Sequence, residues 1–268
     1  MSANTDYYCI DGNYTEEQLL IRNATRDWVK KHVKPHIEEH FQRAETPSYL
    51  VKELSNIGAF GLIIPEIYGG VGADYISFGL MMQELERGDS SIRVISSIQT
   101  SLVMYAIYKF GSEEQRTKYL PKLATGEMLG AFGLTEPDFG SNPSSMHSYY
   151  KTNGENIVIN GSKMWIGNAE TADIAIIWIK DESGHVKGVI VETKNITNFT
   201  TTTLKDKWSF RSSKTGELVF SDSVIAKEQV LAKSTSIQNA YECLNIGRYA
   251  VAWGSIGIAM ECYETALQ

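Results

Sequence analysis

The chain has 268 residues, of which 43% are hydrophobic and 21% are charged, and its formal net charge is −7 at neutral pH. This size and composition support a substantial core, so we exclude an intrinsically disordered protein. The acidic balance, with no basic stretch interleaved with aromatic residues, argues against a nucleic-acid partner.

The N-terminal segment does not have the pattern expected of a signal peptide. The N-terminal segment MSANTDYYCIDGNY lacks a basic region followed by an apolar one, so no signal peptide is expected. The most apolar window, 251–260, is too short to span a bilayer, so we expect no membrane insertion. Cys9, Cys243 and Cys262 are too few and too scattered for a disulfide framework or a zinc site. Together these features predict a soluble, cytoplasmic protein.

The first half of the chain has a helical pattern. Residues 15–18 form a capping box, and apolar residues follow at helical spacing until Pro35, which is expected to bend or end the helix. Further helices are expected over about 46–58, 76–87 and 92–110. Gly111 and a second capping box then begin another helix.

From residue 131 the pattern changes to short β-rich runs. Strands are expected over 157–159, 174–179, 186–193, 199–204 and 217–220. Asn160-Gly161 and Ser183-Gly184 are interpreted as turns between them. These runs predict a small barrel or a two-sheet domain.

A pattern of residues at helical spacing begins again at about Asn239 and continues to Gln268 without a signal that would end a helix. One long helix with a face of small residues cannot bury itself alone. We therefore expect an α+β fold with an all-α domain over 1–130 and a β-barrel-like domain over 131–236. Residues 237–268 would be the first helix of a C-terminally incomplete helical bundle.

The segment 131–146, AFGLTEPDFGSNPSSM, is dense in special residues. Pro137 fixes one backbone angle, and Gly140 can adopt conformations closed to other residues. The hydroxyl groups of Thr135 and Ser141 can donate to a polar ligand with several oxygen atoms. Without further context the segment would be interpreted as a surface loop.

The order of the residues in this segment resembles the flavin-binding signature of the acyl-CoA dehydrogenase family. Other segments agree in the family's order, namely YGGVGADYISFGLMMQELERGD, FGSEEQRTKYLPKLATGE, INGSKMWIGNAETADIAIIW, KWSFRSSKTGELVFSDSVI and YECLNIGRYAVAWGSIG. Their agreement over nearly the whole chain makes coincidence implausible. Within the family, LERGDSSIRVISSIQTSLVM looks most like glutaryl-CoA dehydrogenases.

The resemblance implies that FAD is the cofactor. The residues matching its flavin-binding positions are Phe132, Gly133, Leu134, Thr135, Gly140, Ser141, Trp165, Ile166 and Gly167. The Trp165 indole would pack on the flavin ring, although a core aromatic is the alternative. Most members carry threonine where this chain has Gly167, and its loss should weaken or re-route a hydrogen bond of about 0.5–1.5 kcal/mol.

The resemblance also implies an acyl-CoA substrate. The matching positions are Glu86, Arg93, Val94, Ser141, Tyr241, Leu244, Asn245 and Arg248. An arginine at position 93 would bind the distal carboxylate of a glutaryl chain through its planar guanidinium. Val94 replaces the serine of the subfamily, which makes the expected pocket less polar. The alternative is that Arg93 pairs on a helix surface and that Asn245 and Arg248 are ordinary exposed polar residues.

No residue matches a catalytic base. The reaction that the resemblance implies removes a proton from the carbon next to the thioester carbonyl, and it therefore needs a positioned carboxylate as the base. In the glutaryl subfamily that glutamate belongs to the helical bundle, beyond Gln268, and the position used by a minority of the family is Gly247. His32, His36 and His40 are spaced like metal ligands, but Pro35 interrupts them, so no metal is expected.

The resemblance thus implies that the full enzyme oxidises and decarboxylates glutaryl-CoA to crotonyl-CoA, as in amino-acid catabolism. It would be a homotetramer that passes electrons to an electron-transfer flavoprotein, in the mitochondrial matrix if eukaryotic. One alternative is a short-chain acyl-CoA dehydrogenase or oxidase. The other is a non-catalytic chain that binds flavin or acyl-CoA.

Overall fold

The computed structural model describes residues 6–267. Residues 1–5, which begin the N-terminal segment MSANTDYYCIDGNY, and Gln268 lie outside this range. The helical part consists of α1 (Glu16–Trp28), α2 (Ile37–Arg43), α3 (Ser48–Glu53), α4 (Tyr75–Gly88), α5 (Ser90–Ser97), α6 (Tyr105–Phe110) and α7 (Glu113–Ala124). Both predicted capping boxes are present, with Gln18 bonded to Thr15 and Gln115 bonded to Ser112. These bonds satisfy amides that have no partner inside the helix, which is why α1 and α7 begin there.

The apolar run predicted as one helix over 92–110 has three segments. α5 is followed by a π-helical turn, η5 (Ile98–Met104), and then by α6. A second π-helical turn, η2 (Val29–Val33), follows α1, before Pro35 ends that stretch of helix as expected. π-helical turns rotate the side chains that follow them and occur frequently at functional sites.

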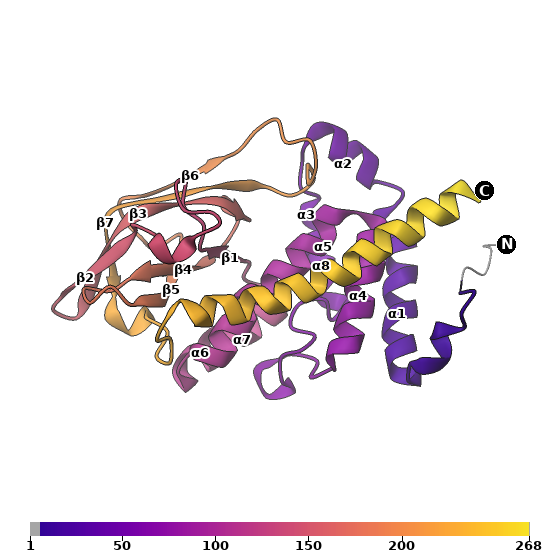
Figure 1. Cartoon of the computed structure of the whole chain (residues 1–268), viewed down its shortest axis with the longest axis horizontal. Coiled ribbons are helices and arrows are strands. Elements are labelled where there is room, and N and C mark those ends of the chain that lie inside the picture. Colours follow the sequence, from indigo (N-terminus) through magenta and orange to yellow (C-terminus); the bar gives the residue numbers. More distant parts are fainter. Residues whose placement is uncertain (1–5, 268) are drawn as a thin grey trace.

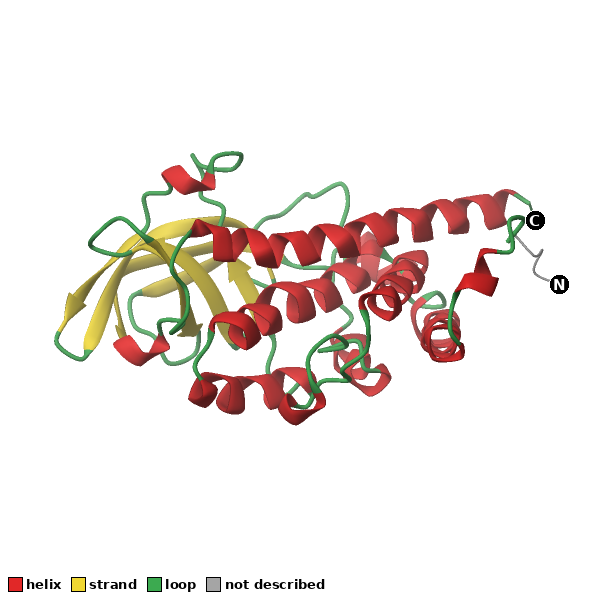
Figure 2. Cartoon of the chain, turned by 60° about the horizontal axis from the view of Figure 1, so that its bottom comes forward, coloured by secondary structure: helices red, strands yellow, loops and turns green. Residues whose placement is uncertain are grey.

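The β part is one curled sheet. Its strands are β1 (Gly130–Gly133), β2 (Tyr149–Asn153), β3 (Asn156–Gly167), β4 (Ile174–Lys180), β5 (Val186–Glu192), β6 (Phe199–Thr203) and β7 (Thr215–Ala226). In the described residues the sheet has seven strands in the order β1-β4-β2-β3-β7-β6, with β5 paired to β4. Figure 2 shows this sheet at one end of the molecule and the helices at the other.

Three details of the predicted β part are wrong. Asn160-Gly161 is not a turn, because it lies inside β3, where the pairing with β7 shifts register. Gly161 is needed there, since a Cβ on it would lie 2.2 Å from Ser148 Oγ. The strand therefore runs to Gly167 instead of ending at 159, and β2 was not predicted at all. The Ser183-Gly184 turn between β4 and β5 is confirmed.

The long helix α8 (Ile237–Ala266) runs from the sheet along the helical part, beside α4 (Figure 1). Its glycines allow this approach, because a Cβ on Gly257 would lie 2.1 Å from the backbone oxygen of Gln83. α8 also carries half-exposed apolar residues, including Val251, Ile256 and Ile258. Among residues 6–267, no helix is long and apolar enough to cross a bilayer.

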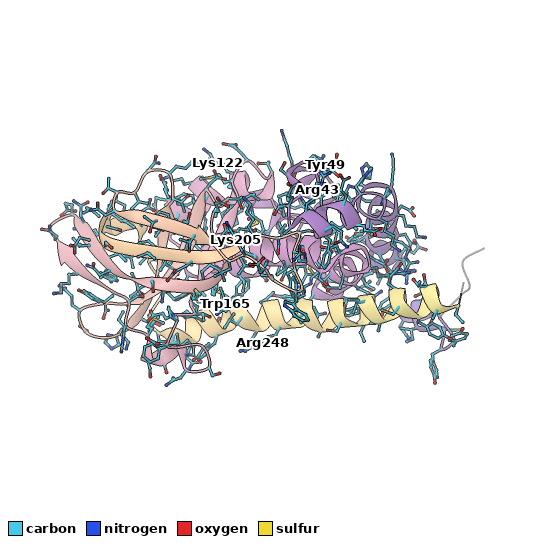
Figure 3. The ribbon with its side chains drawn as sticks, turned by 90° about the horizontal axis from the view of Figure 1, so that it is seen from above. Arg43, Tyr49, Lys122, Trp165, Lys205 and Arg248 are labelled. Carbon is cyan, nitrogen blue, oxygen red and sulfur yellow. The ribbon has the colours of Figure 1, made fainter. Side chains whose placement is uncertain are left out.

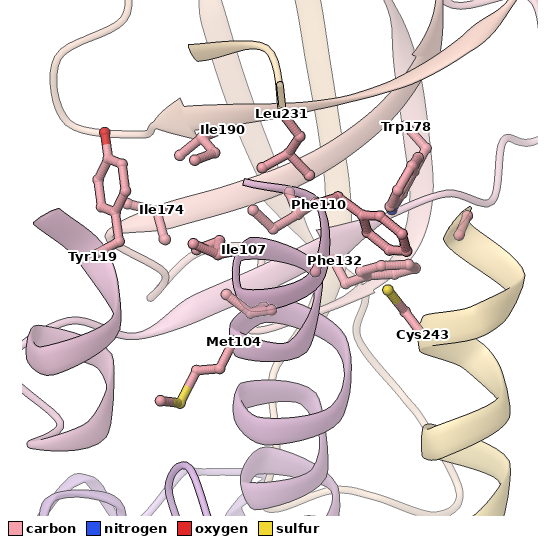
Figure 4. Packing of buried hydrophobic residues seen from close by; sticks show 14 of the residues in the cluster. Met104, Ile107, Phe110, Tyr119, Phe132, Ile174, Trp178, Ile190, Leu231 and Cys243 are labelled. Carbon is pink, nitrogen blue, oxygen red and sulfur yellow. The ribbon is translucent and has the colours of Figure 1, made fainter. Parts of the chain in front are cut away.

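A buried apolar cluster joins all three parts of the chain (Figure 4). Phe132 of β1 and Trp178 of β4 have ring centroids 6.1 Å apart, and Phe110 of α6 meets the same indole edge-on at 6.3 Å. Cys243 of α8 packs into the cluster from the other side. The order of helical domain, β domain and C-terminal helix is confirmed, and this shared core fixes β1 and α8 next to each other.

Candidate functional site

Trp165 lies in a bulge of β3. Between Lys163 and Ile166 the pairing of β3 with β7 shifts register, and Trp165 adopts a left-handed backbone conformation with φ of 64°. Its side chain is 62% exposed, so the alternative that it is a core aromatic is wrong. A left-handed conformation is costly for a bulky residue, and such strain clusters at functional sites. The bulge turns the indole outward, which makes it available to a ligand.

The Trp165 indole borders an open pocket of about 310 Å³, here called the ring pocket. It is lined by Phe132, Leu134, Thr135, Gly140, Ser141, Pro143, Trp165, Ile166, Tyr241, Leu244 and Arg248. The walls come from the end of β1, the loop after it, the β3 bulge and the start of α8. Figure 3 shows Trp165 and Arg248 close together where the sheet meets α8. Segments more than 100 residues apart therefore meet at one site.

The ring pocket combines two kinds of surface. Phe132, Leu134 and Ile166 supply apolar walls, while Thr135 and Ser141 bring hydroxyl groups. A planar aromatic ligand with polar edges fits such a pocket, because its faces need apolar contact and its edges need hydrogen-bond donors. Arg248 adds a positive charge at the rim, and its guanidinium donates to Asn245 Oδ1 at 3.0 Å. Asn245 and Arg248 are both exposed, which agrees with the alternative that they are ordinary exposed polar residues of the helix.

Trp165 also lines a second open pocket, of about 560 Å³. Val94, Ile98 and Gly167 form one wall, and the loop 204–210 forms another. Trp208 in that loop is 96% exposed. Since Trp165 lines both pockets, a long ligand can place a ring in one and extend into the other.

Gly167, at the position where the resemblance implies a threonine in most relatives, borders this second pocket. A Cβ placed on Gly167 would lie 2.4 Å from Ile98 Cδ1. The space that a larger side chain would occupy is therefore filled by isoleucine. Gly133 of β1 is also enclosed, since a Cβ on it would lie 2.6 Å from Ile177 Cδ1.

Glu86 and Arg93 form a buried ion pair between α4, α5 and α8. Arg93 is 4% exposed, and its guanidinium donates to Glu86 Oε2, while the Ser90 hydroxyl donates to Glu86 Oε1. Gly254 of α8 closes the site, because a Cβ on it would lie 2.8 Å from Glu86 Oε2. The alternative of a surface arginine is wrong. The pair lines neither the ring pocket nor the second pocket, although Val94 beside it lines the second.

Sequence reasoning gave no role to a second buried pair, Lys163 and Glu136. Lys163 is fully buried and lies 2.8 Å from Glu136 Oε1. Burial lowers the pKa of Lys163 to about 8, even though the Glu136 charge opposes this shift. Burial raises the pKa of Glu136, but Lys163 and the amides bonded to the carboxylate outweigh it, so the net shift is downward. The signal available in the sequence was a lysine in the middle of a predicted flavin segment, GSKMW.

No metal centre is apparent in the part of the chain that the structure describes. Residues 6–267 contain no group of three or more His, Cys, Asp and Glu side chains that could hold an ion. The lining of the ring pocket, within the same range, includes no carboxylate. These residues therefore suit binding of an aromatic ligand, and the described lining offers no carboxylate base at that pocket.

Similar proteins point to one family. Residues 15–127 match the acyl-CoA dehydrogenase N-terminal domain and residues 131–223 match the acyl-CoA dehydrogenase middle domain. The glutaryl-CoA dehydrogenase of Desulfococcus multivorans is 33% identical over 97% of this chain and 68% of its own length. A short-chain specific acyl-CoA dehydrogenase of Clostridium acetobutylicum is 34% identical over 96% of this chain and 69% of its own length.

A solved structure gives the same result. The glutaryl-CoA dehydrogenase of Mycobacterium smegmatis, in complex with FADH2, superposes with a TM-score of 0.94 at 37% identity. The match covers 97% of this chain and 67% of that chain, so this chain spans about two thirds of the length of these relatives. The chain belongs to the acyl-CoA dehydrogenase family, a family of oxidoreductases.

Proposed function

We propose that this chain binds FAD, with the isoalloxazine ring in the ring pocket and the rest of the cofactor extending past Trp165 into the second pocket. The single observation that carries the proposal is the exposed indole of Trp165, which borders both pockets from a strained bulge. The FADH2-bound relative, with a TM-score of 0.94, supports it. When bound, the flavin supplies a site that accepts a hydride.

We infer that residues around the ring pocket hold the flavin. Thr135 and Ser141 would donate hydrogen bonds to its polar edges, while Phe132, Leu134 and Ile166 would exclude water from its faces. Gly133 and Gly167 would leave room for the neighbouring side chains of Ile177 and Ile98. Gly140, which has no atom within 4 Å of its Cβ position, would let the flavin approach the backbone. The hydroxyl group missing at residue 167 would be replaced by apolar contact with Ile98.

We propose an acyl-CoA thioester as the substrate, bound at the α8 side of the ring pocket. Tyr241, Leu244 and Arg248 line the pocket from that helix, and Ser141 faces them from the loop after β1. Asn245 would orient the Arg248 guanidinium through the bond of 3.0 Å. We assign no catalytic base within residues 6–267, because the described lining contains no carboxylate.

For the whole protein we propose oxidative decarboxylation of glutaryl-CoA to crotonyl-CoA. Arg93 would bind the distal carboxylate after exchanging part of its pairing with Glu86. We further propose domain limits at 130/131 and 236/237, a homotetrameric assembly, an electron-transfer flavoprotein as electron acceptor, and a cytoplasmic or mitochondrial-matrix location.

A second candidate is a short-chain, monocarboxylic acyl-CoA. It is favoured by the closed Glu86–Arg93 pair, which does not reach the ring pocket, and by Val94 at the subfamily's serine position. The short-chain specific relative is as similar to this chain as the glutaryl-CoA relative. Oxidation rates with glutaryl-CoA and butyryl-CoA, measured on the protein expressed from its intact gene, separate the two. A preference for butyryl-CoA that persists in Arg93→Ala would contradict the glutaryl proposal.

The FAD proposal is tested on the 268-residue chain itself. We expect the purified chain to quench FAD fluorescence on binding, and Trp165→Ala to raise the Kd for FAD about tenfold through loss of ring stacking. Because Trp165 is 62% exposed, its replacement should leave the melting temperature nearly unchanged. Trp178→Ala is the matched control, since its buried indole should affect stability first. A chain that stays colourless with added FAD would support the non-catalytic, flavin-free alternative.

A further inference from the structure

The buried pair of Lys163 and Glu136 is connected to the backbone on both of its sides. The Lys163 ammonium donates to the Leu134 carbonyl at 3.1 Å and to Glu136 Oε1 at 2.8 Å. The Glu136 carboxylate also accepts from the backbone amides of His147 at 2.6 Å and Ser148 at 3.0 Å. Both charges are therefore paired and hydrogen-bonded, which is the condition for burying them.

The pair joins two adjacent segments that both line the ring pocket. Leu134 and Thr135 line one wall, directly before Glu136. Lys163 lies on β3 immediately before the bulge that exposes Trp165, which also lines the pocket. The Met164 amide adds a bond of 2.8 Å to the Thr135 carbonyl. The relative position of the two segments is thus set by these bonds, which lie at the fully buried Lys163 and beside it.

Packing around the lysine stem leaves it little freedom. A Cβ on Gly133 would lie 3.2 Å from Lys163 Cγ, so the stem lies against the backbone of β1. The ammonium also lies 3.8 Å from Met146 Sδ, at the end of the loop that carries Gly140 and Ser141. One side chain therefore contacts β1, the residues after it and the end of the loop that borders the pocket.

We propose that Lys163 and Glu136 are positioning residues, which hold Thr135 and Trp165 at the separation that receives the flavin ring before the ligand enters. The inference rests on the proposed function, because the ligand is the proposed FAD. Apolar residues of similar volume often stabilise a protein as well as a buried ion pair does. A pair that also donates to a pocket-wall carbonyl contributes fixed geometry, and a preformed site loses less conformational freedom on binding.

A purely structural role is the competing explanation, and the chain offers a matched control. Glu84 is 1% exposed and accepts two bonds from Arg26, at 2.8 and 3.0 Å, in the helical part of the molecule. Neither residue lines the ring pocket. Glu84→Gln therefore removes the charge of a buried, paired carboxylate as Glu136→Gln does, without touching the pocket walls.

The test compares Lys163→Met, Glu136→Gln and Glu84→Gln in the 268-residue chain. Three properties are measured: the Kd for FAD with the absorption bands of the bound flavin, the melting temperature without FAD, and hydrogen exchange without FAD. We expect both pocket variants to raise the Kd about tenfold, to alter the flavin bands, and to speed exchange over 135–141 and 164–166. Glu84→Gln should lower the melting temperature and leave the Kd and those amides unchanged.

The inference is overturned if the pocket variants lose thermal stability while their Kd stays within about twofold of the unmodified chain and exchange over both segments is unchanged. If Lys163→Met does not fold, the double variant Lys163→Met/Glu136→Met replaces it, because it leaves no buried charge unpaired. It should still bind FAD weakly, and normal binding overturns the inference. If the unmodified chain takes up no FAD, the proposed function fails, and exchange over the two segments still decides the positioning role.

Discussion

Ile98 fills the space beside Gly167, with Cδ1 only 2.4 Å from the place of a Cβ on that glycine. Ile98 begins the π-helical turn η5 and Gly167 ends β3, so this contact joins the helical part to the sheet. The two residues also line the second pocket together. The glycine at this position is therefore explained by the size of its neighbour.

This contact predicts that the effects on stability of substitutions at residues 98 and 167 depend on each other. Gly167→Ala should lower the free energy of unfolding by about 0.5–1.5 kcal/mol, because Ile98 must turn its terminal Cδ1 away from the new methyl group. Ile98→Val removes that atom and alone should cost about 0.5–1.5 kcal/mol. Urea unfolding of the double variant should show a smaller loss than the sum of the two. Gly12→Ala is the control, since no atom lies within 4 Å of the Cβ position of Gly12. Additive losses of unfolding free energy at residues 98 and 167 would contradict the prediction.

The Glu86–Arg93 pair predicts a large effect from removing one partner. Arg93→Met should lower the free energy of unfolding by about 3–5 kcal/mol, because it leaves the Glu86 carboxylate buried without its cation. Glu86→Met/Arg93→Met should recover much of that loss in chemical denaturation. The exposed pair of Arg43 and Glu39 is the control, and Arg43→Met should change stability by less than about 0.5 kcal/mol. A double variant as unstable as Arg93→Met would refute the explanation.

Two glycines of α8 should respond in opposite ways to the same substitution. Gly257→Ala should lower the free energy of unfolding by about 2 kcal/mol or more, since its Cβ would lie 2.1 Å from the Gln83 backbone oxygen. Gly247→Ala meets only the end of the Leu102 side chain, at 3.3 Å. It should be neutral or stabilise by up to about 1 kcal/mol through helix propensity. Equal effects at the two sites in thermal unfolding would show that α8 is not held against α4 as described.

The contact between α7 and β5 predicts a pH dependence. Glu192 accepts hydrogen bonds from Lys118 at 2.8 Å and from Tyr119 at 2.7 Å, and these lower its pKa from 4.5 to about 2. Because the folded-state pKa lies below the unfolded one, the stabilisation is present above pH 4.5 and is lost as pH falls toward 2. Glu192→Gln should therefore be less stable than the unmodified chain at pH 6, with the difference shrinking through that window.

Acid unfolding, followed by circular dichroism at several pH values, measures this difference. Glu155→Gln is the control, because the Glu155 side chain is 84% exposed in its pair with Lys227. Its free energy of unfolding should stay within about 0.5 kcal/mol of the unmodified chain across the range. A gap between Glu192→Gln and the unmodified chain that is constant with pH would contradict the proposed role of the carboxylate.

The sequence by itself determined the elements whose signals are local. Capping boxes fixed where α1 and α7 begin, because the side chains and amides involved lie within four residues of each other. Ordered motifs also identified the family and the segments around Thr135, Trp165 and Arg248. What the sequence could not provide was their separation in space.

Only the tertiary structure decided the features that depend on distant neighbours. Asn160-Gly161 has the composition of a turn, but long-range pairing with β7 keeps it inside a strand, and a bulge further along exposes Trp165. Likewise, Lys163 has a charge that predicts exposure, yet a carboxylate 27 residues away and a carbonyl of the neighbouring segment keep it buried. Such contacts form only when the chain folds, so residue type and spacing named the pocket segments while packing set the geometry between them.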